Sequence, residues 1–133
     1  MKIQERACGC IIIKDEKVLL IRQLSGAWGF PKGHVEHDET EIETAIREVK
    51  EETNIDVQIE ESKRYTMQYY TDKGIGKEVV IFLAKPLTDN LIPQDNEIIE
   101  AAWLSYSDAL ATVSYDNTRD LLLKALKENK LYR

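Results

Sequence analysis

Over much of the chain the apolar residues fall in short runs or alternate with polar ones, patterns typical of strands. The stretch 7–13 is rich in isoleucine and cysteine, and a polar turn at 14–17 separates it from the apolar stretch 18–21, so we expect a buried β-hairpin. The stretch 24–34 contains three glycines and a proline and is expected to be a loop. Further strands are predicted at residues 56–60, 63–70, 78–84 and 100–104.

The periodicity becomes helical between residues 39 and 54. Apolar residues recur there at i, i+3, i+4 and i+7, namely Ile42, Ala45, Ile46 and Val49. We expect an amphipathic helix that begins near Glu39 or Thr40, has Asp38 as its N-cap and docks this face on a core. It should end at Thr53-Asn54, because asparagine is second only to glycine in the left-handed conformation of a helix C-terminus.

Two more helices are predicted after the last strand. Ser105–Asp108 resembles a capping box that opens a short helix reaching about Val113. A final helix should open at Asp116-Asn117, and its apolar stripe consists of Leu121, Leu122, Ala125 and Leu126. This order of elements indicates an α+β fold, an α/β/α sandwich with a mixed β-sheet between helices. The chain has 133 residues, 43% of them hydrophobic, so we expect a single domain over residues 1–133.

Composition argues against several classes of protein. Charged residues make up 32% of the chain and aromatic residues 8%, which indicates neither a disordered nor a membrane protein, and no signal peptide is apparent. The net charge of −6 and the lack of a basic stripe disfavour binding to a nucleic-acid duplex. Cys8 and Cys10 would lie on the same face of a strand and therefore not bridge, so we expect reduced thiols and a cytoplasmic protein.

The acidity is concentrated in one segment. From Glu36 to Glu52 the chain has eight acidic and two basic residues, a net charge that equals the −6 of the whole chain. The helical spacing places four carboxylates on a face beside the apolar one, those of Glu41, Glu48, Glu51 and Glu52. Carboxylates at this spacing repel one another, so a divalent metal ion that prefers oxygen ligands would compensate them. The alternative is that the acidic run is merely a solvated helix face.

The spacing of these residues resembles the signature of the Nudix hydrolase family. The signature consists of a glycine, a glutamate six residues later and a block that contains Arg-Glu and Glu-Glu. The matching residues, within a box over residues 33–55, are Gly33, Glu39, Arg47, Glu48, Val49, Glu51, Glu52 and Ile55. The one departure is Asn54, which stands where the family has glycine and which tolerates the same left-handed backbone.

The resemblance implies metal-dependent attack of water on a polyphosphate. Magnesium is the implied cofactor, with manganese as a substitute. The implied metal ligands are the carbonyl of Gly33 and the side chains of Glu48, Glu51 and Glu52. Glu48, Glu51, Arg47 and Glu97 are the implied catalytic residues. Arg47 would hold the carboxylates by ion pairing, Glu39 would fix the junction of loop and helix, and Glu97 would act as a base or ligand. The alternative for Arg47 is a surface ion pair with Glu43 or Glu51.

The surrounding residues resemble one branch of the family. Trp28 and the stretch 31–36 are similar to the branch that hydrolyses diadenosine tetraphosphate and related dinucleoside polyphosphates, including the branch acting on diphosphoinositol polyphosphates. Lys32, His34 and Lys77 would then contact phosphates. Arg22, at the end of the second predicted strand, is a separate candidate for a phosphate contact, and the alternative is a charge at a sheet edge. Ile81 stands where that branch has a purine-stacking tyrosine, so a stacking face would have to come from Tyr65, Tyr69, Tyr70 or Tyr115.

Three hypotheses about function follow. The first is a metal-dependent hydrolase of a dinucleoside polyphosphate, with a small nucleotide as its partner and a monomer or homodimer as its assembly. The second keeps the chemistry but changes the substrate to a nucleoside triphosphate, an RNA 5′ end, ADP-ribose or a diphosphoinositol. The third is a regulatory module that binds nucleotide without cleaving it, which the complete set of box carboxylates disfavours.

Overall fold

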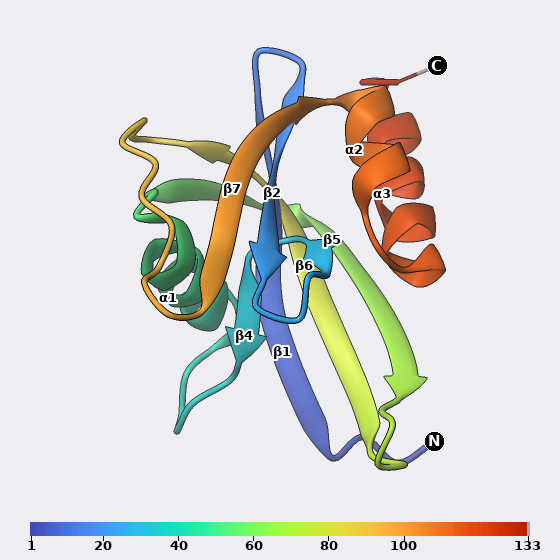
Figure 1. Ribbon diagram of the computed structural model, residues 1–133. Helices are drawn as coiled ribbons and strands as arrows, with labels where there is room; N and C mark the ends of the chain where they lie inside the picture. The colour runs from blue at the N-terminus through green and yellow to red at the C-terminus, as the bar shows by residue number, and fades with distance from the viewer. Residues whose placement is uncertain (133) are drawn as a thin grey trace.

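The computed structural model describes residues 1–132, which form a mixed β-sheet with helices on both sides (Figure 1). The strands and helices in chain order are β1 (Glu5–Lys14), β2 (Lys17–Gln23), β3 (Trp28–Gly29), β4 (Lys32–His34), α1 (Glu41–Thr53), β5 (Val57–Tyr70), β6 (Gly76–Pro86), β7 (Ile98–Ser105), α2 (Tyr106–Thr112) and α3 (Asp116–Glu128). The predicted α/β/α sandwich is confirmed.

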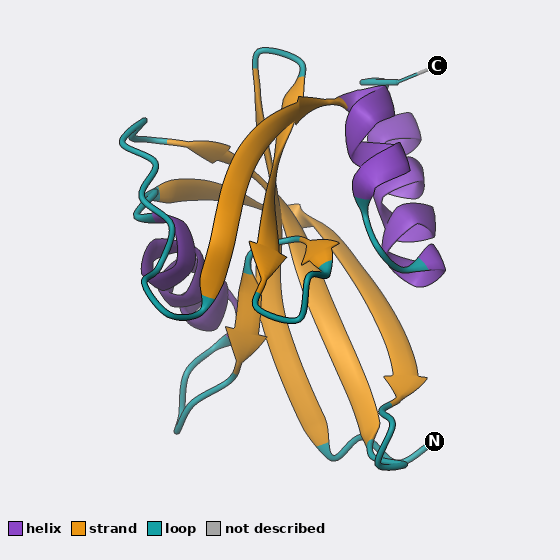
Figure 2. Cartoon of the chain, in the orientation of Figure 1, coloured by secondary structure: helices purple, strands orange, loops and turns teal. Residues whose placement is uncertain are grey.

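The strands fall into two groups that meet at β1 and β2. β1 pairs with β4 on one side and with β6 on the other, and β6 pairs with β5. β2 pairs with β3 and β7. The β1–β6 pair is parallel and the others are antiparallel, and β1 joins β2 only at the hairpin end, through Ile13 with Val18 and Lys14 with Lys17. Figure 2 shows the two groups splaying apart from this hairpin.

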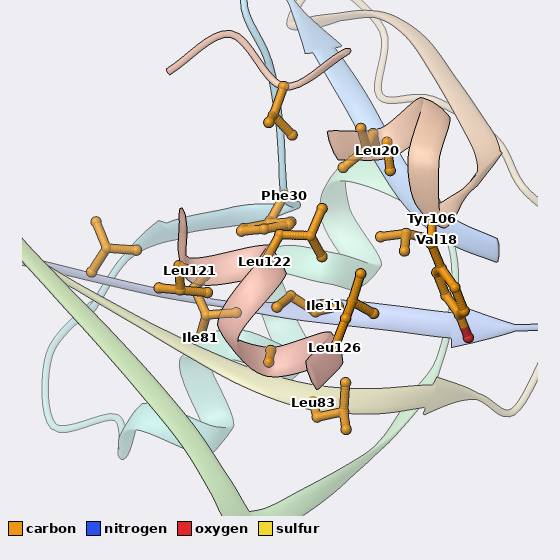
Figure 3. Packing of buried hydrophobic residues seen from close by; sticks show 14 residues of the cluster. Ile11, Val18, Leu20, Phe30, Ile81, Leu83, Tyr106, Leu121, Leu122 and Leu126 are labelled. Carbon is orange, nitrogen blue, oxygen red and sulfur yellow. The ribbon is translucent and has the colours of Figure 1, made fainter. Parts of the chain in front are cut away.

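Each face of the sheet has its own core. The first core lies under α2 and α3 and contains the predicted stripe of α3, as Figure 3 shows for Leu122 and Leu126 beside Phe30 and Ile11. Burying a side chain of this size contributes about 1.5–3 kcal/mol to folding. The second core lies under α1 and includes Cys8, Cys10, Ala45 and Val49. Both cysteines are free thiols, as expected.

α1 differs from the prediction at its start and on one face. Its N-cap is Thr40 rather than Asp38, because Thr40 forms a reciprocal capping box with Glu43. Ile46, which was expected to dock on the core, is 39% exposed, because the buried face turns toward Thr44, Ala45 and Val49. The C-terminal prediction is confirmed, since Asn54 has a left-handed φ of 66°.

Two strand predictions also require correction. The stretches 56–60 and 63–70 form one strand, β5, whose pairing with β6 shifts register between Ile59 and Arg64. The irregular register absorbs the extra residues that looked like a break in the sequence. The loop 24–34 contains the short strands β3 and β4. Among residues 1–132, no helix combines the length and apolar character needed to cross a bilayer.

Candidate active site

The C-terminal half of α1 lies against β4, and this places two carboxylates at one strand. Glu52 is buried with 7% exposure, and its Oε1 accepts a hydrogen bond from the Lys32 backbone N–H at 2.8 Å. The Glu48 carboxylate lies so close to Gly33 that a Cβ there would be 2.1 Å from Glu48 Cδ. Only glycine can therefore stand at residue 33 without displacing the Glu48 carboxylate.

Burial governs the protonation of these two carboxyl groups. Desolvation raises the pKa of Glu52 to about 8, with a smaller contribution from the charge of Glu48, while the Lys32 hydrogen bond opposes the shift. Burial also raises the pKa of Glu48, and the hydrogen bond from Arg47 opposes it. A buried carboxylate beside a second, half-buried carboxylate is costly to ionise, so the site favours a bound proton or a bound cation.

Arg47 connects the loop before α1 to the carboxylates on α1. Its Nε donates to Glu39 Oε2 at 2.7 Å and its Nη2 to Glu39 Oε1 at 2.9 Å. Its Nη1 donates to Glu48 Oε1 at 2.8 Å and to Glu51 at 3.2 Å, and Nη2 also reaches the His34 carbonyl at 3.0 Å. The hydrogen bonds from Arg47 are the main reason why the pKa of Glu39 falls to about 2. Arg47 is thus part of a partly buried network rather than of an isolated surface pair.

The donor set fits a hard divalent cation. The acidic groups beside Lys32 and Gly33 are the carboxylates of Glu48 and Glu52, and carboxylate oxygens are the ligands that hard divalent cations prefer. Within residues 1–132 no group of three or more acidic, histidine or cysteine side chains converges as a ready metal site. Arg47 Nη1 donates to carboxylate oxygens of both Glu48 and Glu51 and so links these two side chains. Glu41 lies apart from this group and is compensated by a two-fold hydrogen bond from Arg64.

We call Glu48 and Glu52, with the β4 backbone beside them, the acidic site. A cleft of about 590 Å³ adjoins it at Lys32. Its lining includes the predicted phosphate contacts Lys32 and Lys77 and the aromatic side chains of Trp28, Tyr69, Tyr70 and Tyr115. Burial lowers the pKa of Lys32, and the nearby Lys77 lowers it further, while Glu52 and Glu48 oppose both effects. Two crowded ammonium groups beside aromatic walls favour an anionic ligand that carries a planar ring.

Lys32 belongs to both parts of the site. Its backbone N–H binds the Glu52 carboxylate, and its side chain lines the cleft. A ligand whose negative groups reach Lys32 therefore lies next to the acidic site.

Other residues predicted from the sequence lie farther out. His34 is exposed, outside the cleft lining, with its Nε2 3.4 Å from a Glu5 carboxylate oxygen. Arg22 also lies outside the lining, and its Nε donates to the Gly26 carbonyl at 3.3 Å. Glu97 is exposed in the turn before β7, and its charge helps to raise the pKa of Glu52. The phosphate-binding and catalytic roles of these residues stay predictions.

The structure selects among the aromatic candidates and adds residues that the sequence analysis missed. Tyr65 accepts a hydrogen bond from Asn129 at 3.0 Å and packs on the core under α3, so it does not line the cleft, unlike the other three tyrosines. The start of α3 contributes Asn117 and Thr118 to the lining. No local pattern marks these two residues, because only the packing of α3 across the sheet brings them to the cleft.

Comparison with known proteins agrees with this geometry. A family model described as the NUDIX domain matches residues 4–125. The bis(5′-nucleosyl)-tetraphosphatase [asymmetrical] of Caenorhabditis elegans is 30% identical over 131 residues, which cover 86% of this chain and 94% of that protein. A crystal structure of a C. elegans Ap4A hydrolase binary complex superposes with a TM-score of 0.85 at 30% identity, covering 96% of this chain and 99% of that one.

A second relative is longer than the matched region. The putative mutator protein MutT4 of Mycobacterium tuberculosis is 35% identical over 96 residues, which make up 71% of this chain. The match spans only 39% of MutT4.

Proposed function

The chain belongs to the NUDIX family of pyrophosphohydrolases, and from this premise we propose that it cleaves the polyphosphate of a dinucleoside polyphosphate. Diadenosine tetraphosphate is the proposed substrate, and ATP and AMP are the proposed products. The observation that carries the proposal is the place of Lys32, whose backbone binds the buried Glu52 while its side chain lines the cleft. The likeness to the C. elegans tetraphosphatase over nearly its whole length supports the same substrate class.

The cleft side chains would bind and orient the nucleotide. Lys32 and Lys77 would neutralise the phosphate oxygens, which otherwise repel an incoming nucleophile. Tyr69, Tyr115 or Trp28 would supply a face for the nucleobase, since base–aromatic stacking contributes about 1–3 kcal/mol per base. The polyphosphate would then run from the cleft past Lys32 toward α1.

Nudix hydrolases generally need divalent metal ions, and we propose magnesium here, with manganese as a substitute. The proposed ligands are the Gly33 carbonyl and the carboxylates of Glu48, Glu51 and Glu52. A bound metal would neutralise phosphate charge and lower the pKa of a bound water. Arg47 would hold the carboxylates of Glu48 and Glu51 in place, as its hydrogen bonds already do.

The remaining task is proton removal from the attacking water. The water oxygen forms a bond to phosphorus, the bridging P–O bond breaks, and the released phosphate oxygen keeps the electron pair. Glu51 and Glu97 are exposed carboxylates near the acidic site, and either would accept the proton of the water. Glu52 is better suited to a ligand role, because it is buried against β4.

A substrate panel tests the proposal. Purified protein with magnesium is incubated with diadenosine tetraphosphate, ATP, ADP-ribose, a capped RNA oligonucleotide and a diphosphoinositol, and products are identified by chromatography and mass spectrometry. We expect the highest kcat/KM for diadenosine tetraphosphate, with ATP and AMP as products, and water labelled with heavy oxygen would show which product carries the new oxygen. A higher kcat/KM for another substrate rejects the dinucleoside assignment, and binding without turnover supports the regulatory module.

A pair of variants tests the site itself. Glu52→Gln keeps the shape of a buried carboxyl group but removes its charge, and turnover should fall by about tenfold or more. Glu61→Gln is the matched control, because Glu61 is an exposed carboxylate on β5 and its loss should leave turnover unchanged.

A further inference from the structure

Thr44 forms a contact that is unusual for a helical threonine. It lies on α1 and is fully buried, and its hydroxyl donates to Glu39 Oε1 at 2.9 Å. Threonines inside helices commonly return the hydroxyl to a carbonyl one turn earlier, as Thr53 does by donating to the Val49 carbonyl at 2.6 Å. Thr44 instead donates to a side chain of the loop that precedes the helix.

Glu39 is the anchor of the Arg47 network, and Thr44 helps to fix it. Glu39 Oε1 accepts from the Glu36 N–H at 3.0 Å, from Thr44 at 2.9 Å and from Arg47 Nη2 at 2.9 Å. Its Oε2 accepts from Arg47 Nε at 2.7 Å. Thr44 is the one neutral side-chain donor of this set, and it is fixed by its place in the helix and by burial.

The chain of contacts continues from Glu39 to the proposed metal ligands. The guanidinium of Arg47 is planar, so two hydrogen bonds to Glu39 fix the direction of its third nitrogen. That nitrogen, Nη1, donates to Glu48 and Glu51. Rotation of the Glu39 carboxylate would therefore move both carboxylates.

We propose that Thr44 is a positioning residue that sets the orientation of the metal-binding carboxylates through Glu39 and Arg47. The proposal rests on the proposed function for the identity of the ligands. It assigns to the Thr44 hydroxyl a role in metal affinity that is separate from its contribution to folding.

Three variants separate these two contributions. Thr44→Val removes the hydroxyl at nearly constant volume, and Thr44→Ser restores it. Thr53→Val is the matched control, because it removes a buried threonine hydroxyl of the same helix that bonds only backbone atoms. Each protein is titrated with Mn²⁺ without nucleotide, and free Mn²⁺ is measured by electron paramagnetic resonance.

Direct partners of metal ligands typically contribute 10–100-fold to affinity, so for this more distant residue we expect Thr44→Val to weaken Mn²⁺ binding by about three- to tenfold. Thr44→Ser should bind within about twofold of wild type, and so should Thr53→Val although its stability falls. With a substrate from the panel, kcat of Thr44→Val should fall while KM stays within about twofold, because the cleft lysines are untouched.

Three results would overturn the proposal: unchanged Mn²⁺ affinity in Thr44→Val, equal loss in Thr44→Ser, or equal loss in Thr53→Val. If Thr44→Val does not fold, Thr44→Ala takes its place with the same expectations, since alanine has the highest helix propensity. Because Mn²⁺ affinity is measured without nucleotide, a protein that binds metal but cleaves no panel substrate refutes the proposed function and leaves the test of Thr44 intact.

Discussion

The buried carboxyl group of Glu52 makes a specific prediction about stability and pH. Its pKa is raised by burial from 4.5 to about 8 in the folded protein. Between these values the folded chain keeps a proton that the unfolded chain has released, so the folded state binds more protons. The free energy of unfolding therefore decreases as pH rises through this window. The contribution is favourable near pH 5 and is lost by about pH 8.

The size of this effect follows from the linkage relation. One unit of pKa shift corresponds to about 1.4 kcal/mol, and a shift from 4.5 to about 8 gives a loss of roughly 3 kcal/mol between about pH 5.5 and pH 8. The side chain is only 7% exposed, so solvent screening reduces this value little. A loss of this size is a large part of the 5–15 kcal/mol by which domains are typically stable.

Glu52→Gln is the perturbation that isolates this group. The amide keeps an oxygen for the Lys32 N–H but does not ionise. The variant should therefore lack the decrease of roughly 3 kcal/mol in the free energy of unfolding, and without metal it should be more stable than wild type near pH 8. Urea unfolding followed by tryptophan fluorescence and circular dichroism, at several pH values with chelator, measures the difference. Saturating Mg²⁺ should flatten the wild-type curve, because a ligand that binds only the folded state stabilises it. Parallel pH curves for wild type and Glu52→Gln would refute the reasoning, and Glu61→Gln should retain the wild-type slope.

Three further experiments test separate parts of the structure. Gly33→Ala should lower Mg²⁺-dependent turnover by about tenfold or more with little change in melting temperature, because the new Cβ displaces only the flexible end of Glu48. Gly9→Ala should mainly destabilise the fold, because its Cβ would meet a backbone oxygen 2.1 Å away. Equal melting temperatures for the two variants would contradict this. Asn54→Ala should be about 1 kcal/mol less stable than Asn54→Gly, because alanine is strained at a left-handed φ and both variants lose the hydrogen bond that Asn54 Nδ2 donates to the Asn90 carbonyl; urea unfolding at fixed pH decides. Lys77→Ala should raise KM for the nucleotide by about tenfold with a smaller effect on kcat, and an unchanged KM in steady-state assays would remove Lys77 from the binding site.

Local patterns were sufficient for most elements of the fold. The helices α1 and α3 and the left-handed cap at Asn54 depend on neighbours within one or two helical turns, and the structure confirms them, although Ile46 of the α1 stripe is exposed. The predicted N-cap, Asp38, was wrong. Thr40 is the cap because Glu43 returns the hydrogen bond.

The strands show where local patterns fail. The polar residues 61 and 62 look like a break between two strands, but β5 runs through them, and its pairing with β6 shifts register between Ile59 and Arg64. Ile46 matches the apolar spacing of α1 but is exposed, because the helix is oriented by contacts that the spacing does not contain.

Some features of the candidate site likewise follow from local spacing, and others depend on tertiary packing. The sequence by itself determined the set of carboxylates and Arg47, since their spacing on one helix is a local property, and it determined the family resemblance. Only the tertiary structure decided that Glu52 binds the Lys32 backbone and that Lys32 joins the acidic site to the cleft. These contacts join segments whose distance in space depends on how α1, the sheet and α3 pack, and packing of distant segments leaves no periodic signal in the chain.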